Sequence, residues 1–430
     1  MIRLIGLWLL LMGSATFAEL TEIESRISEV ARQKKDSAIA LLEEVVNINS
    51  GTMNHEGVRQ VGAVFRRELD RLGFTTRWHD MSAVNRSGHL FADNQGSGVC
   101  QLLIGHLDTV FEETSPFQRF NRNADQASGP GVNDMKGGDV VIIKALETLA
   151  EIGVLDNSRY IVALTGDEEK SGSPKSVSRA HLLDAAEQCD LALGFEYAKG
   201  LDTAAVARRG SSGWTLEVSG KRAHSSLIFR DGIGSGAIFE AARILTGFHE
   251  QVRGEEYLSF NPGMIAGGTE VGHTAVLNSA EVYGKSNVIA QKVIIQGGLR
   301  TISRKQELAA RQSMREIVEQ GSLPETAAEI HFSDGYPAMS PSQGNMELFA
   351  VLDSVSQDLG YGAMTPGNPG QRGAADVSFV ADYVDALDGI GAEGNGAHTL
   401  DESIDLATLP LLIERAALLM YRLSQGRGIR

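Results

Sequence analysis

The chain has 430 residues, of which 42% are hydrophobic and 22% are charged. This length suits two domains better than one, and the hydrophobic content is sufficient for large cores. The formal net charge of −16 at pH 7 excludes nucleic acid as a main partner, because the phosphates would be repelled.

The first 18 residues have the pattern of an export signal. Arg3 provides a positive start, residues 4–12 are apolar, and small residues lead up to Ala18, so we expect cleavage after Ala18. The alternative is a membrane anchor, but the apolar run is short for a spanning helix and the next segment is polar. We therefore expect a periplasmic or secreted protein with no membrane attachment after cleavage.

Short apolar strands and amphipathic helices then alternate along the chain. Apolar residues at helical spacing predict helices over 22–46, 57–72 and 137–152. Apolar runs predict strands over 74–80, 99–104, 160–164 and 191–195. This order is typical of an α/β fold with a mixed, mostly parallel sheet flanked by helices. Segments 345–359, 376–381 and 406–423 complete the same domain.

The middle of the chain has a different pattern. Strands are predicted over 213–219, 288–299 and 328–332, with helices over 233–252 and 305–320. This β-α-β-α-β order describes a small α+β module of roughly 130 residues. We therefore divide the mature chain into a catalytic domain, 19–205 and 338–430, and an inserted module, 206–337.

The chain has two cysteines, Cys100 and Cys189, and each stands at the start of an apolar strand-like run. Two buried thiols are one interpretation. In an oxidising compartment a disulfide is the other, provided that the two strands are neighbours. The sequence does not give the distance between them, so both interpretations stay open.

Acidic and imidazole side chains gather where predicted strands end. They are His106, Asp108, Asp134, Glu168, Glu169, Glu196 and His398. In parallel sheets, ligands bind at the carboxyl ends of strands. Charges beside buried strands are costly unless they are neutralised, and imidazole and carboxylate are the ligands that zinc prefers in catalytic sites. The pattern indicates a metal-dependent hydrolase with a pair of divalent cations.

Six motifs occur in the order of a known family. They are 105–110 (GHLDTV), 129–138 (GPGVNDMKGG), 165–169 (TGDEE), 194–196 (GFE), 220–225 (GKRAHS) and 396–398 (GAH). On these motifs the chain resembles the M20 family of di-zinc metallopeptidases over residues 40–425. Within that family it is most similar to the glutamate carboxypeptidase group of folate-cleaving enzymes.

The resemblance implies a role for each residue of the acidic set. His106 and Glu196 would hold one zinc, Glu169 and His398 the other, and Asp134 would bridge the two. Asp108 would orient His106, and Glu168 would be the general base for a zinc-bridged hydroxide. Cobalt or manganese could replace zinc. The family often has a cis peptide after the bridging aspartate, which here would be Asp134–Met135.

The resemblance also implies roles for residues of the inserted module and of one nearby loop. The module resembles the family's ferredoxin-like lid, through which homodimers usually form. His224 would stabilise the oxyanion, commonly in the partner's active site. Arg300 would bind the substrate's terminal carboxylate. Asn287 would contact substrate, and Gly373 would line its pocket.

Two departures from the family pattern concern substrate binding. The acid that usually stands near the lid arginine is absent from 297–300 (GGLR), which leaves Arg300 without an expected partner. The loop before Asp376 is 372–375 (RGAA) instead of a glycine-rich Ser/Thr loop. Arg372 would bring positive charge near the substrate, which suggests a substrate with an acidic side chain.

The sequence thus predicts an exported exopeptidase that hydrolyses the amide bond to a C-terminal amino acid, in a small peptide or an N-acyl amino acid. An N-acyl amino acid amidohydrolase, a dipeptidase or an aminopeptidase of the same family is the nearest alternative. A peptide-binding protein without activity is an alternative of another class, but it would not need Glu168.

Overall fold

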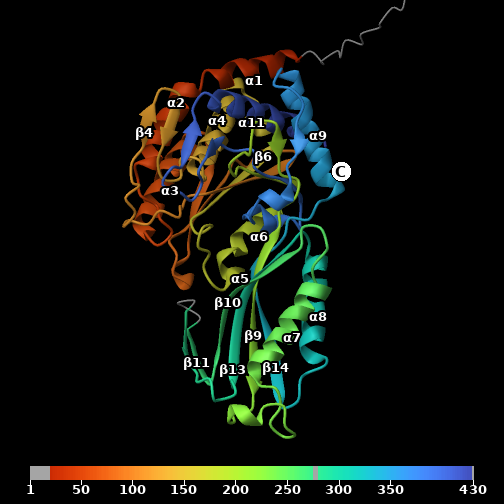
Figure 1. The fold of residues 1–430 in the computed structure, drawn as a ribbon. Helices are drawn as coiled ribbons and strands as arrows, with labels where there is room; N and C mark the ends of the chain where they lie inside the picture. The colour runs from red at the N-terminus through yellow and green to blue at the C-terminus, as the bar shows by residue number, and fades with distance from the viewer. Residues whose placement is uncertain (1–19, 275–278, 429–430) are drawn as a thin grey trace, which may run out of the picture.

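The computed structural model describes residues 20–274 and 279–428, so the predicted signal segment 1–18 lies outside the described residues. The described chain forms two bodies, one above the other in Figure 1. The larger body contains the first and last described elements, α1 and α11, and the smaller one is inserted in the middle of the sequence. The predicted insert, 206–337, encloses every strand and helix of the smaller body.

A six-stranded sheet forms the centre of the larger body, in the order β1-β2-β6-β3-β7-β16. The strands are β1 (Thr75–Asp80), β2 (Gly88–Asp93), β3 (Cys100–His106), β6 (Arg159–Thr165), β7 (Leu191–Gly194) and β16 (Asp385–Leu387). The last four are parallel to one another, whereas β1 and β2 pair antiparallel at one edge. The predicted mixed, mostly parallel sheet is confirmed.

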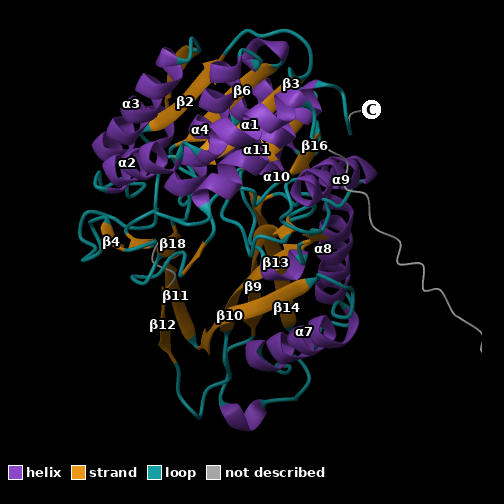
Figure 2. Ribbon diagram, turned by 90° about the horizontal axis from the view of Figure 1, so that it is seen from above, coloured by secondary structure: helices purple, strands orange, loops and turns teal. Residues whose placement is uncertain are grey.

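Helices cover both faces of this sheet. Side chains alternate along β3, so Leu103 packs into the core on one face while Leu102 and Ile104 pack into the core on the other. The first face carries α1 (Glu22–Arg32), α2 (Lys35–Val46), α3 (His55–Arg71), α4 (Lys136–Ile152), α9 (Gln343–Asp358) and α11 (Leu409–Ser424). The second carries α6 (Ala180–Ala186) and α10 (Val377–Val380), and the short helix α5 (Lys175–Ser178) comes directly before α6. Figure 2 shows α1, α4 and α11 lying over the strands.

The single helix predicted over 22–46 is wrong, because the structure breaks it into α1 and α2. Gln33 and Lys34 lie between the two helices, and both keep right-handed helical backbone angles. The apolar periodicity therefore runs through the turn almost undisturbed, which hides the break from the sequence. The Lys34 ammonium is held at this corner by Glu147 and Glu151 of α4.

The smaller body is a four-stranded antiparallel sheet with two helices on one face. Its elements are β9 (Gly210–Gly220), α7 (Ala237–Gln251), β10 (Ser259–Gly268), β13 (Lys292–Thr301), α8 (Arg304–Glu319) and β14 (Thr326–Tyr336). The strand order β10-β13-β9-β14 gives the ferredoxin-like arrangement. The sequence prediction missed β10. This edge strand contains Pro262 and its register shifts between Pro262 and Met264, both features that weaken a strand pattern.

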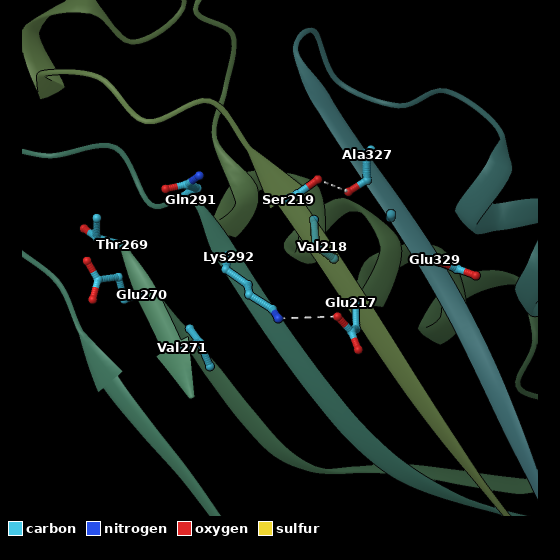
Figure 3. Close-up of a pocket in the computed structure, with 11 residues that line it drawn as sticks. Glu217, Val218, Ser219, Thr269, Glu270, Val271, Gln291, Lys292, Ala327 and Glu329 are labelled. Carbon is cyan, nitrogen blue, oxygen red and sulfur yellow. Dashed lines mark hydrogen bonds and ion pairs between the residues drawn. The ribbon is translucent and has the colours of Figure 1, made fainter. Parts of the chain in front are cut away.

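A hairpin extends from the end of β10 before the chain enters β13. It consists of β11 (Glu270–Thr274) and β12 (Ser279–Tyr283). A hollow of about 660 Å³ separates β11 from the four-stranded sheet of the smaller body (Figure 3). It is bordered by the ion pair between Lys292 and Glu217, whose Nζ and Oε2 lie 3.5 Å apart. None of the predicted site residues lines this hollow.

Short strands pair loops that are distant in the sequence. One small sheet contains β4 (Asn121–Asn123), β5 (Gln126–Ser128), β17 (Gly394–Asn395) and β18 (Ser403–Asp405). The other pairs β8 (Thr203–Ala204) with β15 (Thr365–Pro366). The 3₁₀ turns are η1 (Ser82–Val84), η2 (Leu155–Asn157), η3 (Ser225–Leu227) and η5 (Pro369–Gln371). Among the described residues, no helix has both the length and the apolar character needed to cross a membrane.

Cys100 and Cys189 form a disulfide. β3 and β7 are parallel neighbours, so the two cysteines at their starts lie side by side, with 4.5 Å between the Cα atoms. Of the two interpretations that the sequence allowed, the structure selects the disulfide. It closes a loop across 89 positions of the sequence.

We expect the double variant Cys100→Ala, Cys189→Ala to lose about 2–4 kcal/mol of unfolding free energy, because the unfolded chain is no longer cross-linked. Denaturant titration of both proteins gives the difference. Peptide mapping of the wild-type protein without reduction should show the 100–189 cross-link. Recovery of two alkylated thiols from unreduced, denatured protein would contradict the disulfide.

Candidate metal centre

Three neighbouring parallel strands position His106, Glu168 and Glu196. β3 ends at His106, β6 ends three residues before Glu168, and β7 ends two residues before Glu196. Because the strands are parallel, these side chains meet at one edge of the sheet. His106 is 1% exposed and Glu196 8% exposed, so the edge is closed from solvent on the side of these residues.

Asp134 lies between the two histidines. Its Oδ1 is 3.3 Å from Nε2 of His106, and its Oδ2 is 3.1 Å from Nε2 of His398. Asp134 comes from the loop just before α4, whereas His398 comes from the loop between β17 and β18. One carboxylate with one oxygen toward each histidine is the geometry expected of a bridging ligand.

Each histidine has a second carboxylate beside it. Oε1 of Glu196 is 3.7 Å from Nε2 of His106, and Oε2 of Glu169 is 3.1 Å from Nε2 of His398. The five predicted ligands therefore divide into two half-sites that share Asp134. Glu168 belongs to the first half-site, since it, His106 and Glu196 offer ligand atoms within 4.8 Å of one another.

The donor set suits divalent cations. Nε2 of His106 and Oε1 of Glu169 are buried without a hydrogen-bond partner among the described residues. Burial raises the pKa of the Glu168 carboxyl, and burial together with the charge of Asp134 raises the pKa of Glu196 to about 8. Buried carboxylates that repel one another in this way are stabilised when cations bind between them.

Asp108 acts on the site through both its backbone and its side chain. Its carbonyl oxygen is 3.0 Å from Nδ1 of His106, whereas its Oδ1 is 3.5 Å from that nitrogen. The carboxylate accepts hydrogen bonds from the backbone N–H groups of Glu168 and Glu169, at 3.0 and 3.2 Å. The hydrogen bond to His106 thus comes from the backbone carbonyl of Asp108, whereas the expected partner was its carboxylate. The carboxylate holds the Glu168–Glu169 turn, which the prediction did not include.

Glu402 holds the loop that carries Asp134, and sequence reasoning missed it. Its carboxylate accepts hydrogen bonds from the backbone N–H groups of Gly131, Asn133 and Asp134. Glu402 is fully buried and lies only four residues after His398, which is the one local signal that could have indicated it. The Asp134–Met135 peptide is cis, as the family resemblance implied.

Arg300 and Gly373 lie where the two bodies meet. Arg300 stands near the end of β13 and pairs in register with Ser211, at the start of β9. Within the described residues the Arg300 side chain has no hydrogen-bond or ion-pair partner, as the missing acid predicted. The carbonyl of Gly373 accepts a hydrogen bond from Nη1 of Arg208, and nothing lies within 4 Å of where a Gly373 side chain would begin.

His224 and Asn287 lie at the opposite end of the smaller body. β9 runs away from the large sheet for 11 residues, roughly 35 Å at the usual rise per residue, and His224 follows it. The Ser225 N–H donates to the carbonyl of Asn287, and His224 pairs with Val288. The structure therefore brings His224 and Asn287 together, but away from the metal centre of their own chain.

Arg372 is buried beside the metal centre. Its Nη1 donates to the carbonyl of Tyr197, the residue after Glu196, and its Nη2 has no hydrogen-bond partner in the described chain. Arg208 is also buried, forms an ion pair with Asp388, and has its Nη2 3.9 Å from Oε2 of Glu196. The sequence pattern indicated Arg372 but not Arg208.

The sheet, the inserted lid and the acidic site together define a two-domain metallopeptidase. The chain belongs to peptidase family M20/M25/M40, whose pattern matches residues 102–422. It is a hydrolase at the level of this family, and the family predicted from the motifs is confirmed.

Similar proteins agree with this assignment. The chain is 26% identical over 407 residues to carboxypeptidase G2 of Pseudomonas sp. (strain RS-16), covering 93% of this chain and 92% of that protein. The solved aminopeptidase PepT from Bacillus cereus has a TM-score of 0.70 at 17% identity, covering 90% of this chain and 97% of that one. A dinuclear metal binding peptidase of the M20 family from Bacillus subtilis has a TM-score of 0.58 at 14% identity, covering 94% and 99%.

We expect Glu402→Ala to weaken metal binding by about 10–100-fold, because the loop of Asp134 loses the acceptor for three N–H groups. Titration of zinc into metal-free protein measures the affinity. Asp401→Ala is the matched control, since Asp401 is an adjacent, exposed acid. Equal zinc affinity in the two variants would rule out this role for Glu402.

Proposed function

We propose that this protein is an exported di-zinc exopeptidase that hydrolyses the amide bond to a C-terminal amino acid. The observation that carries the proposal is the position of Asp134 between two histidines, with a glutamate ligand on each side and Glu168 next to one half-site. Similarity to a carboxypeptidase over nearly the whole chain favours release of the C-terminal residue. The N-terminal pattern of residues 1–18 supports export.

In this proposal His106, Glu196 and Asp134 hold one cation, and Glu169, His398 and Asp134 hold the other. When bound, the two cations supply Lewis acidity and lower the pKa of water. Glu168 accepts the proton of the attacking water and passes it to the leaving nitrogen. Its burial beside the first half-site places it where it can both take and return a proton.

Two arginines at the junction of the bodies fit a substrate carboxylate. Arg300 has no partner of its own among the described residues, and Arg209 lies close enough for its charge to lower the pKa of Arg300 beyond the effect of burial. Such a pair attracts an anion, and a guanidinium binds a carboxylate through two hydrogen bonds. We assign the terminal carboxylate of the substrate to Arg300.

The buried charge of Arg372 favours a substrate with a second acidic group. Once Glu196 is shared with a cation, Arg372 and Arg208 are two buried guanidiniums with Asp388 as the acid paired to Arg208. Burial first, and then the charge of Arg208, lower the pKa of Arg372. An acidic side chain in the substrate would offset this excess positive charge, so we propose a preference for glutamate or aspartate.

A homodimer through the lid is part of the proposal. β10 is an edge strand with one side unpaired, and edge strands pair readily with another copy. Ile265 on β10 and Ile238 and Phe239 on α7 are 63%, 52% and 52% exposed. Ile238 lies beside β10, 3.5 Å from the position of a Gly267 side chain, so strand edge and apolar helix face form one surface.

Glu168→Ala should lower kcat by at least about 100-fold, because the general base is lost, while both metals stay bound through the other ligands. Elemental analysis gives the metal content, and hydrolysis of an N-acyl glutamate gives the rate. Glu187→Ala, at an exposed site remote from the ligands, serves as the control. Near-normal turnover in Glu168→Ala would refute the assignment.

A panel of N-acyl amino acids ending in Glu, Ala and Lys tests the substrate preference. We expect kcat/KM for the Glu compound to exceed that for the Ala compound by about 10–100-fold. A charge-assisted hydrogen bond between Arg372 and the substrate carboxylate would give a difference of this size. Arg372→Met should remove the preference and leave the Ala rate nearly unchanged. Comparable rates on all three compounds with the wild-type enzyme would eliminate an acidic subsite. Product analysis on N-blocked and unblocked dipeptides distinguishes a carboxypeptidase from an aminopeptidase.

Mixing two inactive variants tests whether His224 acts across a dimer. In a mixture of Glu168→Ala and His224→Ala chains, half of the dimers are heterodimers and each has one complete site. We therefore expect about a quarter of wild-type activity after subunit exchange, because symmetric dimers place each lid against the other chain. If exchange is shown by mass measurement and activity does not return, His224 does not act in trans.

A further inference from the structure

The lid joins the larger body through two chain segments that pair with each other. Arg208, just before β9, and Met339, just after β14, form an antiparallel bridge, and the Arg208 N–H donates to the Met339 carbonyl at 2.9 Å. On the other side, Ala205 and Asp388 exchange backbone hydrogen bonds next to β16. This two-strand connection is the route by which a change in lid orientation reaches the larger body.

Strand β14, which leads from the lid back to the larger body, contacts Glu168, the proposed base. Tyr336 is the last residue of β14, and its hydroxyl donates to the backbone carbonyl of Glu168 at 2.7 Å. The Tyr336 ring packs edge-on against Phe379 with 4.9 Å between ring centroids. A lid residue thus bonds directly to the backbone of Glu168.

A buried arginine fixes the Tyr336 hydroxyl in place. Nη2 of Arg179 donates to that hydroxyl at 2.8 Å. The same guanidinium is ion-paired with Asp167 and Asp376, and Arg179 is 1% exposed. With the arginine donating to it, the hydroxyl directs its own hydrogen to the Glu168 carbonyl.

Glu168 is therefore held from two sides by different parts of the molecule. Its N–H is bonded to Asp108 of the larger body, and its C=O is bonded to Tyr336 of the lid. Glu168 lies beyond the end of β6, where no sheet hydrogen bonds restrain it. Its position consequently depends on both contacts.

We propose that Tyr336 is a positioning residue that couples the lid to catalysis by holding the backbone of Glu168. The inference rests on the proposed role of Glu168 as the base. Because Tyr336 belongs to the lid strand β14, the Glu168 carboxylate is aligned only in a lid orientation that keeps this bond. Misplacement of a catalytic group by about 1 Å can cost 100-fold in rate, so loss of one backbone contact affects turnover.

Tyr336→Phe tests the proposal, since it removes the hydroxyl and keeps the ring. We expect kcat to fall by about tenfold or more while KM changes by less than about twofold, because the contact aligns the base and does not bind substrate. Metal content stays at the wild-type value. Tyr361→Phe is the matched control, because it also removes a hydroxyl bonded to a buried partner, Glu414, far from the metal centre.

Thermal unfolding of both variants identifies any loss of stability, and kcat is then compared at a temperature where each is folded. Equal kcat values in Tyr336→Phe and Tyr361→Phe would overturn the coupling. Glu168→Ala is measured alongside. If it remains active, the proposed function itself fails; if it is inactive while Tyr336→Phe equals wild type, only the positioning role fails.

Discussion

The main physical constraint on this structure is the repulsion among carboxylates that meet at one edge of the parallel part of the sheet. The side chains of Asp134, Glu169 and Glu196 are buried beside two histidines, of which His106 is buried and His398 is exposed to solvent. Like charges at this spacing and burial are unfavourable without cations. The surrounding fold accordingly supplies acceptors for the backbone N–H groups of these acids: Asp108 holds the Glu168–Glu169 turn, and Glu402 holds the loop of Asp134.

The supporting contacts connect the metal centre to the junction between the two bodies. Arg208 lies between the predicted ligand Glu196 and the loop of Gly373, and Tyr336 binds the carbonyl of Glu168. The chain segments that carry the lid therefore also contact the groups proposed to perform hydrolysis. Arg300 and Arg209 stand at the same junction, so substrate binding and lid orientation are expected to influence each other.

Much of this could be predicted from local patterns, and the failures have physical causes. The strands that lead to His106 and Glu196 are short apolar runs because they are buried on both faces of the sheet. The break at Gln33–Lys34 was missed because the turn preserves helical angles. β10 was missed because an edge strand tolerates Pro262 and the glycines around it. Glu402 and Tyr336 were missed because their partners are backbone groups far away in the sequence, which leave no periodic or motif signal.

Sequence patterns were enough to identify the imidazoles and carboxylates at strand ends, the family to which the chain belongs, and the absence of the usual acid near Arg300. Which of these atoms meet depends on the folded chain. It placed Asp134 between His106 and His398, joined Cys100 to Cys189, and carried His224 to the far end of the lid. The physical reason is that strand order and loop pairing set the distances between residues hundreds of positions apart, whereas local side-chain patterns encode only each segment's own conformation and burial.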